Sequence, residues 1–356
     1  METKMLCCGI DVSHLTLDVT YQNNLGELFH LQVGNNMGGF KKILEHTGTD
    51  YHFVMEATGV YYIRLAFYLH GQGCKLSVVN AMSIKRYIQM HLERNKSDKK
   101  DSGWICKYAI EQRPGFWEMP DSAYFESKQL FNTIREYAEQ VKRFTNQLHS
   151  LKLLPVPSKE TIQSIEKMKA YLEKEMAVLE KKLEACLKQW QPDQYKSINS
   201  IKGLGKRATA LLIIFTQGFR HTKNHRQLIS FAGLSPTEYS SGSSIKGNNR
   251  IYKKGGKTIR DVLYMCAMNA KQTNVACKQL FDRLKANGKT GKQALIAVMN
   301  KLLKQVFAVV KNNSLYQLNY CSAKPKKNRK LLGFLHSSCW LSGLFFYDCY
   351  AACLYF

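Results

Sequence analysis

Two aspartates, Asp98 and Asp101, lie three residues apart in the lysine-rich segment RNKSDKKDSGWICKYA, residues 94–109. On a helix, residues with this spacing share a face, so the two carboxylates would lie side by side and repel each other. A cation beside them would relieve that repulsion, and the sequence suggests two kinds. The neighbouring lysines could pair with the aspartates at a helix start, or a metal ion could bind between them. The spacing alone leaves both possibilities open.

Two further acids lie near the ends of apolar segments in the same part of the chain. Asp11 is near the end of MLCCGIDV, and Glu56 ends YHFVME. In sheets that contain parallel strands, functional residues gather near the carboxyl ends of the strands. Four converging carboxylates could hold one or two Mg²⁺ ions, because Mg²⁺ prefers hard oxygen ligands. Two such ions would clamp the attacking and leaving oxygens of a phosphoryl transfer.

The elements that would position these acids follow from hydrophobic periodicity. Three strands come first, and helices and strands then alternate, which gives the order βββαβαβα. This order predicts an α/β fold with a mixed sheet and helices on its faces. The strands are expected at 5–12, 15–21, 28–33, 51–56 and 74–80, and the helices at 38–46, at 59–73 and after 80. The segment at 15–21 alternates in hydrophobicity, which is typical of a half-buried strand.

A heptad pattern follows and predicts a long helix over 125–154. Its seam consists of Leu130, Ile134, Tyr137, Val141, Phe144, Leu148 and Leu151. The sequence LLPVPS breaks this helix, and a second helical run follows at about 161–190. The two would form a helical hairpin, which could be a solvated arm or an oligomerisation surface. We favour the oligomerisation surface, because two helices alone bury only a small core.

The third part of the chain carries two features that suit phosphate contacts. The segment SIKGLGKRATALLIIF, 200–215, has the pattern of a helix–hairpin–helix, whose turn can offer backbone N–H groups to a phosphate. Residues 241–260 form a loop rich in Ser and Gly that contains no acid. Its position between apolar segments favours contact with a nucleic-acid backbone over a disordered linker. Its cations are Lys246, Arg250, Lys253, Lys254, Lys257 and Arg260.

Composition supports a polyanionic partner. The chain of 356 residues has 52 Lys+Arg against 27 Asp+Glu, a formal net charge of +25. Such an excess suggests nucleic acid or an acidic membrane surface. The eleven cysteines are odd in number, form no CxxC pair and follow no signal peptide, so we expect reduced thiols in the cytoplasm. The apolar stretch 331–356 is long enough to span a bilayer but contains Asp348, and we expect an appendage outside the core.

Several motifs together resemble one known family. GIDVSHLTLDV, MEATGVYYIRLAFYL, VVNAMSIKRY and KSDKKDSGWICKYA are similar to the amino-terminal region of the DEDD transposases of bacterial insertion sequences. This family includes the Piv-type DNA invertases. IKGLGKRATALL, FAGLSPTEYSSG and YKKGGKTIR resemble its carboxy-terminal region. The resemblance covers roughly residues 5–315 in the expected order.

The resemblance implies a domain organisation. It gives an RNase H-like (RuvC-like) domain at 1–120, a coiled-coil hairpin at 121–190 and a mainly helical transposase domain at 191–315. The remaining residues, 316–356, form a basic and then apolar tail that has no counterpart in the family.

The resemblance also implies the chemistry and the partners. Mg²⁺ would be held by Asp11, Glu56, Asp98 and Asp101. Ser241 would be the nucleophile, and the acids and the serine together would form a composite site. The partners would be donor and target DNA, a structured bridge RNA and further copies of the chain in a dimer or tetramer. The protein would act in the bacterial cytoplasm, at the nucleoid.

This chain departs from the family in a few places, and two alternatives remain. The family often has Thr and Ala at the positions of Ser97 and Ser102, and Asn at the position of Gly256. Further serines at 240, 243 and 244 surround the candidate nucleophile. The first alternative is a RuvC-like nuclease that uses metal-activated water. The second is an inactive relative that only binds nucleic acid.

Overall fold

The computed structural model describes residues 5–92, 98–220, 222–237, 240–241, 245–246, 250–251 and 256–318. These residues divide into two compact units, one ending at Met119 and the other beginning at Pro120. The apolar segment 331–356 and the cations Lys253 and Lys254 lie outside the described residues. Each unit is considered by itself below.

The first unit is built on a mixed five-stranded sheet with the strand order β3-β2-β1-β4-β5. The first three strands pair antiparallel, and β4 and β5 continue the sheet in parallel with β1. The predicted order βββαβαβα is confirmed as β1 (Cys7–Val12), β2 (Thr16–Gln22), β3 (Leu28–Gly34), α1 (Met37–Thr47), β4 (His52–Glu56), α2 (Tyr62–Gly71), β5 (Lys75–Val79) and α3 (Ala81–Met90). The helix α4 (Asp98–Gln112) follows, and the α/β fold class is as expected.

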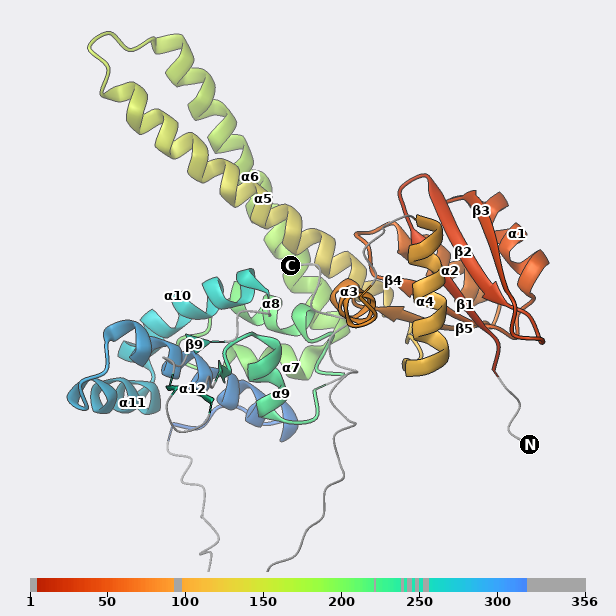
Figure 1. The fold of residues 1–356 in the computed structure, drawn as a ribbon. Coiled ribbons are helices and arrows are strands. Elements are labelled where there is room, and N and C mark those ends of the chain that lie inside the picture. Colours follow the sequence, from red (N-terminus) through yellow and green to blue (C-terminus); the bar gives the residue numbers. More distant parts are fainter. Residues whose placement is uncertain are drawn as a thin grey trace, which may run out of the picture. The chain divides into compact units, whose positions relative to one another are not determined.

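Helices cover both faces of the sheet, as Figure 1 shows. On one face, Phe40 of α1 and Leu65 of α2 share a core with Ile10 of β1. On the other face, Ile84 of α3 and Ile105 of α4 share a second core with neighbouring strand residues. The side chains of β1 alternate between the two cores, since successive residues of a strand point to opposite faces.

Close packing of α4 on β1 depends on Gly9. A Cβ atom at this position would overlap the backbone nitrogen of Cys106 and would lie 2.6 Å from the carbonyl oxygen of Ser102. Side chains at position 9 are therefore excluded by the α4 backbone itself. The Cys106 thiol also donates to the carbonyl oxygen of Cys7 at 3.5 Å. The helix consequently lies directly against the first strand.

The prediction that 15–21 is half-buried is wrong. Asp18 and Thr20, on the face expected to be polar and solvated, are each only 5% exposed. The reason is that α4 packs over this face as well, so β2 is covered on both sides. Leu15, which the pattern assigned to the buried face, precedes the strand and is 73% exposed.

The second unit begins with the predicted pair of long helices, α5 (Ser122–Lys152) and α6 (Lys159–Trp190). Figure 1 shows them side by side as a hairpin with the Pro-containing turn at its tip. Ile134 and Leu148 of the heptad seam are buried against the partner helix, whereas Met168 of the second helix is half exposed. All the cysteines in the described residues are free thiols, as expected.

The remaining helices of the second unit form a compact bundle. They are α7 (Pro192–Asn199), α8 (Lys206–Phe215), α9 (His225–Phe231), α10 (Lys257–Thr273), α11 (Val275–Ala286) and α12 (Gly291–Lys311). Among the described helices, α12 alone has the length and apolar composition to cross a membrane. It begins at a capping box formed by Thr290 and Gln293, and it buries Val298, Leu302 and Val306 completely. In this structure it is the central core helix of the bundle.

Between α9 and α10 the chain forms two short strand pairs. The pair β6 (Pro236–Thr237) and β9 (Arg250–Ile251) encloses the pair β7 (Ser240–Ser241) and β8 (Ile245–Lys246). Part of the segment expected to be a loop is therefore a nested antiparallel ribbon.

A candidate carboxylate site and a serine ribbon

Asp11 and Glu56 occupy adjacent places at the ends of two parallel strands. The register of β1 and β4 pairs Ile10 with Met55, and each acid is the next residue of its strand. Both acids face α4, because residues two apart in a strand project to the same face. Gly9, two residues before Asp11, lies against the α4 backbone, and Val54, two residues before Glu56, belongs to the core that α3 and α4 form with the sheet. Both are half-buried, and the Thr58 hydroxyl donates to Glu56 Oε1 at 3.0 Å. The sheet thus brings together these two predicted site residues.

The direction of α4 carries the other two acids toward the same end of the sheet. Cys106 contacts Cys7, whereas Ser102 lies one turn earlier, against Gly9. The helix and β1 therefore run in opposite directions, and the N-terminal end of α4 lies toward Asp11. Asp98 and Asp101 lie at this N-terminal end of α4, and Asp101 is half-buried. The side chain of Asp98 lies outside the described part of the structure.

These residues fit a divalent metal in their chemistry and in part of their geometry. Carboxylate oxygens are the ligands that Mg²⁺ and similar hard ions prefer. Two of the acids are in register, and the helix bearing the other two approaches them closely because residue 9 is glycine. Within the described residues, however, no three His, Cys, Asp or Glu side chains are grouped closely enough to form a metal site. The convergence of all four acids stays a prediction.

Asp18, which was not among the predicted site residues, lies directly opposite Asp11 in the β1–β2 ladder. Residues paired in this way project to the same face, so a fifth acid lies beside the predicted set. Its buried carboxylate accepts hydrogen bonds from His30 Nε2 at 3.1 Å and from Gln32 Nε2 at 3.2 Å. The signal was available in the strand LTLDVTY, where an acid alternates with Thr20 on one face.

The candidate nucleophile and two of the predicted phosphate-binding cations, Lys246 and Arg250, belong to the second unit's ribbon. Ser241 pairs with Ile245, and Ser240 pairs with Lys246, across three intervening residues. Arg250 lies in the outer strand pair, and Lys257 is exposed at the first turn of α10. Arg260, one turn further on, is half-buried. The side chains of Ser241, Lys246 and Arg250 lie outside the described part of the structure.

The predicted helix–hairpin–helix is present as α7, a tight turn and α8. Gly203 in this turn has φ +99°, and a Cβ there would lie 2.6 Å from the Cβ of Ala270 on α10. The turn is fixed further by the buried amide of Asn274, which donates to the Lys202 carbonyl oxygen at 3.1 Å and accepts from the Cys277 backbone N–H at 3.2 Å. The motif is thus rigidly attached to the bundle.

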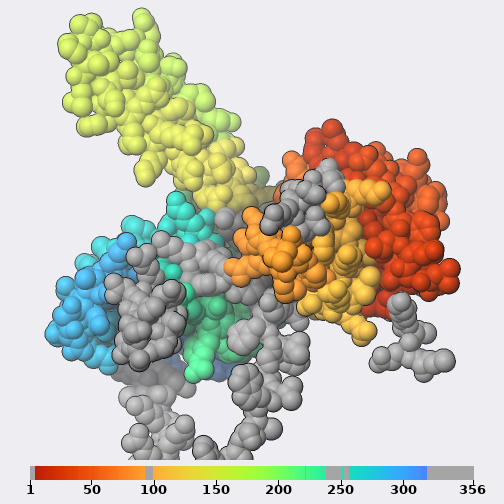
Figure 2. Space-filling model, in the orientation of Figure 1, coloured from red at the N-terminus to blue at the C-terminus, as the bar shows by residue number. Residues whose placement is uncertain are grey.

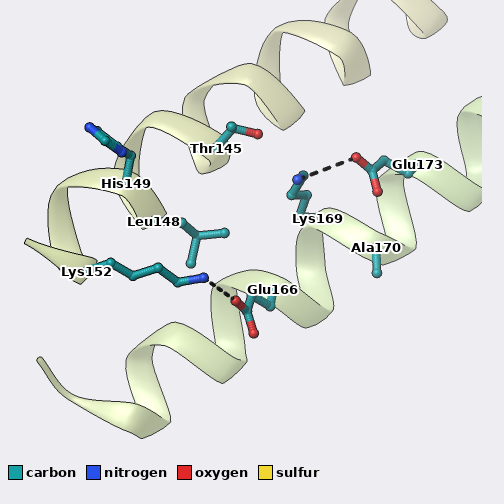
Figure 3. A pocket seen from close by; sticks show the side chains of 8 residues that line it. All are labelled: Thr145, Leu148, His149, Lys152, Glu166, Lys169, Ala170 and Glu173. Carbon is teal, nitrogen blue, oxygen red and sulfur yellow. Dashed lines mark hydrogen bonds and ion pairs between the residues drawn. The ribbon is translucent and has the colours of Figure 1, made fainter.

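A groove between the two long helices is lined by paired charges and shows no catalytic arrangement. It has a volume of about 390 Å³ and lies between α5 and α6 near the hairpin tip (Figure 3). Lys152 pairs with Glu166 at 3.0 Å, and Lys169 pairs with Glu173 at 3.7 Å. Such exposed ion pairs contribute little stability, and they neutralise the groove's charge.

Comparison with known proteins identifies the same two regions. Residues 8–154 match a family model described as a transposase of the DEDD IS110 type, and residues 195–282 match one described as "Transposase IS116/IS110/IS902 family". Together the two matches cover more than half of the chain. The pilin gene-inverting proteins of Moraxella lacunata and Moraxella bovis are each 27% identical over 327 residues, which are 86% of this chain and 95% of theirs. An uncharacterized 43.6 kDa protein of insertion element IS110 from Streptomyces coelicolor is 28% identical over 120 residues, 34% of this chain and 29% of that protein.

Proposed function

Because this chain belongs to the IS116/IS110/IS902 transposase family, it is a DNA-recombining enzyme, and we propose that it cuts and rejoins DNA with four carboxylates and a serine. The observation that carries this proposal is the alignment of Asp11 with Glu56 on the face covered by α4. The N-terminal end of that helix bears Asp98 and Asp101. The proposal has all four acids converging at one edge of the sheet, which a non-catalytic binding protein would not need.

The family implies a divalent metal, which we propose is Mg²⁺ held by Asp11, Glu56, Asp98 and Asp101. When bound, such an ion offsets the negative charge that develops on a phosphodiester during its displacement. The carboxylates themselves would repel DNA, so their placement in a protein of charge +25 is consistent with a metal site.

In this proposal Ser241 is the nucleophile. Its Oγ would attack a DNA phosphorus and form a phosphoserine ester, while the serine proton passes through a base in the site to the departing deoxyribose oxygen, which leaves as a hydroxyl. The number of phosphate ester bonds is unchanged, so a hydroxyl from another strand can reverse the step and rejoin the DNA. The Ser-Gly step at 241–242 and the flanking cations support this role, because a glycine lets the backbone approach a phosphate closely.

The partners follow from charge and from exposed apolar surface. Donor and target DNA are the substrates, and we propose that a structured bridge RNA guides their choice. The excess of positive charge agrees with binding this much nucleic acid. We also propose that the hairpin joins copies of the chain into a dimer or tetramer. Met168, Tyr171 and Val178 leave a stripe of α6 between 41% and 58% exposed. The site of action would be the bacterial cytoplasm.

A denaturing-gel assay tests the nucleophile. Wild-type protein incubated with labelled substrate DNA should form a covalent adduct, and Ser241→Ala should lose both the adduct and strand exchange. DNA binding should stay nearly unchanged, because it depends mainly on contacts with phosphates. Loss of a nucleophile typically lowers the rate by several orders of magnitude.

The control variants Ser240→Ala, Ser243→Ala and Ser244→Ala separate Ser241 from its neighbours. Normal cleavage by Ser241→Ala without any adduct would favour the alternative, a nuclease that uses activated water. Loss only in Ser240→Ala would move the nucleophile by one residue. Recovery of activity on mixing Ser241→Ala with Asp11→Ala chains would show that acids and serine come from different subunits.

A further inference from the structure

The outer side of α4 carries a stripe of two cations and an aromatic ring. Lys100, Trp104 and Lys107 are spaced by four and three residues, so they lie above one another on one face of the helix. Ser102 and Cys106 face the sheet instead. Both lysines are exposed and Trp104 is half-buried. These three residues are called the α4 stripe below.

The ring of Trp104 is held in place from the side of α3. The ring centroid of His91, just after α3, lies 5.0 Å away, and that of Tyr87 lies 6.1 Å away, edge-on. Tyr87 is itself fixed, because its buried hydroxyl donates to Glu111 at 2.6 Å. Lys107 places its ammonium nitrogen 4.5 Å from the centroid of the Trp104 ring, above one face. This face is therefore covered by an exposed lysine side chain and not by packed core.

Cations outnumber acids around the α4 stripe, although Asp98, Asp101 and Glu111 lie on the same helix. The neighbouring helix α3 contains no acid, and its Lys85 and Arg86 are exposed. Glu111, on the same side of α4 as the stripe, accepts a hydrogen bond from Tyr87 and keeps its negative charge, so the cations exceed the acids without being alone. In Figure 2 both helices reach the surface of the first unit, in orange and light orange. A polyanion is therefore the partner that this surface fits.

An aromatic ring between two cations is the combination that binds unpaired nucleic acid. A base stacks on the ring, and the flanking cations contact successive phosphates. The Lys107 ammonium now occupies the place that a base would take, and a flexible lysine can move from there to a phosphate. A DNA duplex exposes no base face along its length, so the ring has a use only where bases are unpaired.

We propose that the α4 stripe binds an unpaired DNA strand beside the carboxylate site, with a base on Trp104 and phosphates at Lys100 and Lys107. The location follows from Asp101, which lies one helical turn before Trp104 on α4. This inference rests on the proposed function in one respect only, namely that the bound strand is the DNA being cleaved. A recombinase must hold separated strands at some point between cutting and rejoining them.

Fluorescence anisotropy with the full chain tests this binding in buffer containing EDTA, where no cleavage occurs. The probe is a labelled single-stranded DNA of mixed sequence, compared with the same sequence as duplex and as single-stranded RNA. Trp104→Ala should weaken single-stranded DNA binding about 5- to 100-fold, the range expected for one lost base stack. Trp104→Phe should retain most of the affinity. Lys107→Gln should weaken binding. It should also reduce the slope of the log affinity against the log salt concentration by the amount expected for one phosphate contact.

The matched control is Phe29→Ala. Phe29 is an exposed aromatic residue of the same unit, 45% accessible, on the edge strand β3 where it stacks on Tyr21. This variant should bind single-stranded DNA like wild type. Unchanged binding by folded Trp104→Ala would overturn the proposal, and so would a loss confined to duplex DNA or to RNA.

Photocrosslinking to bromodeoxyuridine-containing single-stranded DNA provides a test that needs no variant. Crosslinks should map to the tryptic peptide DSGWICK, residues 101–107, and their absence there would contradict the proposal. Failure here is distinguishable from failure of the proposed function. Strand exchange that persists in Asp101→Ala would refute the carboxylate mechanism, whatever Trp104 binds.

Discussion

The hydroxyl of Thr20 on β2 lies 2.8 Å from the hydroxyl of Ser102 on α4, and both side chains are buried. This bond fastens the helix that bears Asp98 and Asp101 to the strand beside Asp11. Ser102 also donates to the carbonyl oxygen of Lys99 at 3.0 Å, within the first turns of α4. A chain with alanine at position 102 would lack this bond.

Replacing only one of these two hydroxyls should destabilise the first unit. Ser102→Ala leaves the Thr20 hydroxyl buried without this partner, and the free energy of unfolding should fall by about 1–3 kcal/mol. The double variant Thr20→Val with Ser102→Ala should recover part of the loss, because neither buried group then lacks a partner. Urea denaturation of the four proteins gives the coupling energy. Purely additive losses would mean that the two hydroxyls do not interact.

Gly9→Ala should disturb both stability and activity. The added methyl group meets backbone atoms of α4, which cannot rotate away, so the helix must shift from β1. We expect a loss of roughly 1–3 kcal/mol in urea denaturation and a strong loss of strand exchange. Gly103→Ala is the matched control on the same helix. A Cβ there meets no atom within 4 Å, and it should stabilise α4 by about 0.5–1 kcal/mol. Equal effects of the two substitutions would contradict this packing.

The first unit should lose stability in mild acid because of His52. Burial, and then the charge of Lys75, lower the pKa of His52 to about 4, and its Nε2 lies 2.7 Å from the Ser77 hydroxyl. The unfolded chain binds a proton near pH 6.5 and the folded chain does not, so stability is present above pH 6.5 and is lost as the pH falls toward 4. The loss is at most on the order of 3 kcal/mol.

The comparison with His52→Gln isolates this effect from other titrating groups. The variant should show a flatter dependence of unfolding free energy on pH between 6.5 and 4, measured by urea denaturation at several pH values. The same slope in wild type and variant would show that other groups cause the acid sensitivity.

The carboxylates should give a metal effect that can be measured without DNA. Mg²⁺ or Mn²⁺ should raise the melting temperature of wild-type protein, since a ligand that binds only the folded state stabilises it. Asp11→Asn should abolish most of this shift, and so should Glu56→Gln, whereas Glu118→Gln, an exposed acid in the same unit, should not. An unchanged metal response in Asp11→Asn and Glu56→Gln would argue against a metal site at these residues.

Light scattering tests the hairpin as an oligomerisation surface. Replacing Met168 and Tyr171 with Glu puts charge on the exposed stripe of α6 and should reduce the mass of the assembly. The matched substitution Ala177→Glu, at an exposed position of the same helix outside this stripe, should leave the mass unchanged. A wild-type protein that is monomeric with and without nucleic acid would contradict the proposal.

The sequence by itself determined the order of elements and the ends of β1 and β4, because hydrophobic period and glycine or proline breaks are local properties of the chain. It also placed Asp11 and Glu56 near strand ends and Asp98 with Asp101 on a helix. The two long helices followed from a heptad seam, which needs no knowledge of the partner helix.

Only the tertiary structure decided which faces those elements present to each other. The alternating pattern of β2 predicted one solvent-exposed face, but α4 covers it, and the burial of Asp18 and Thr20 is visible only in three dimensions. The direction of α4 over β1, and the need for glycine at position 9, depend on contacts between residues nearly 100 positions apart. Such contacts leave no periodic trace in one sequence, because each partner is locally compatible with many other arrangements.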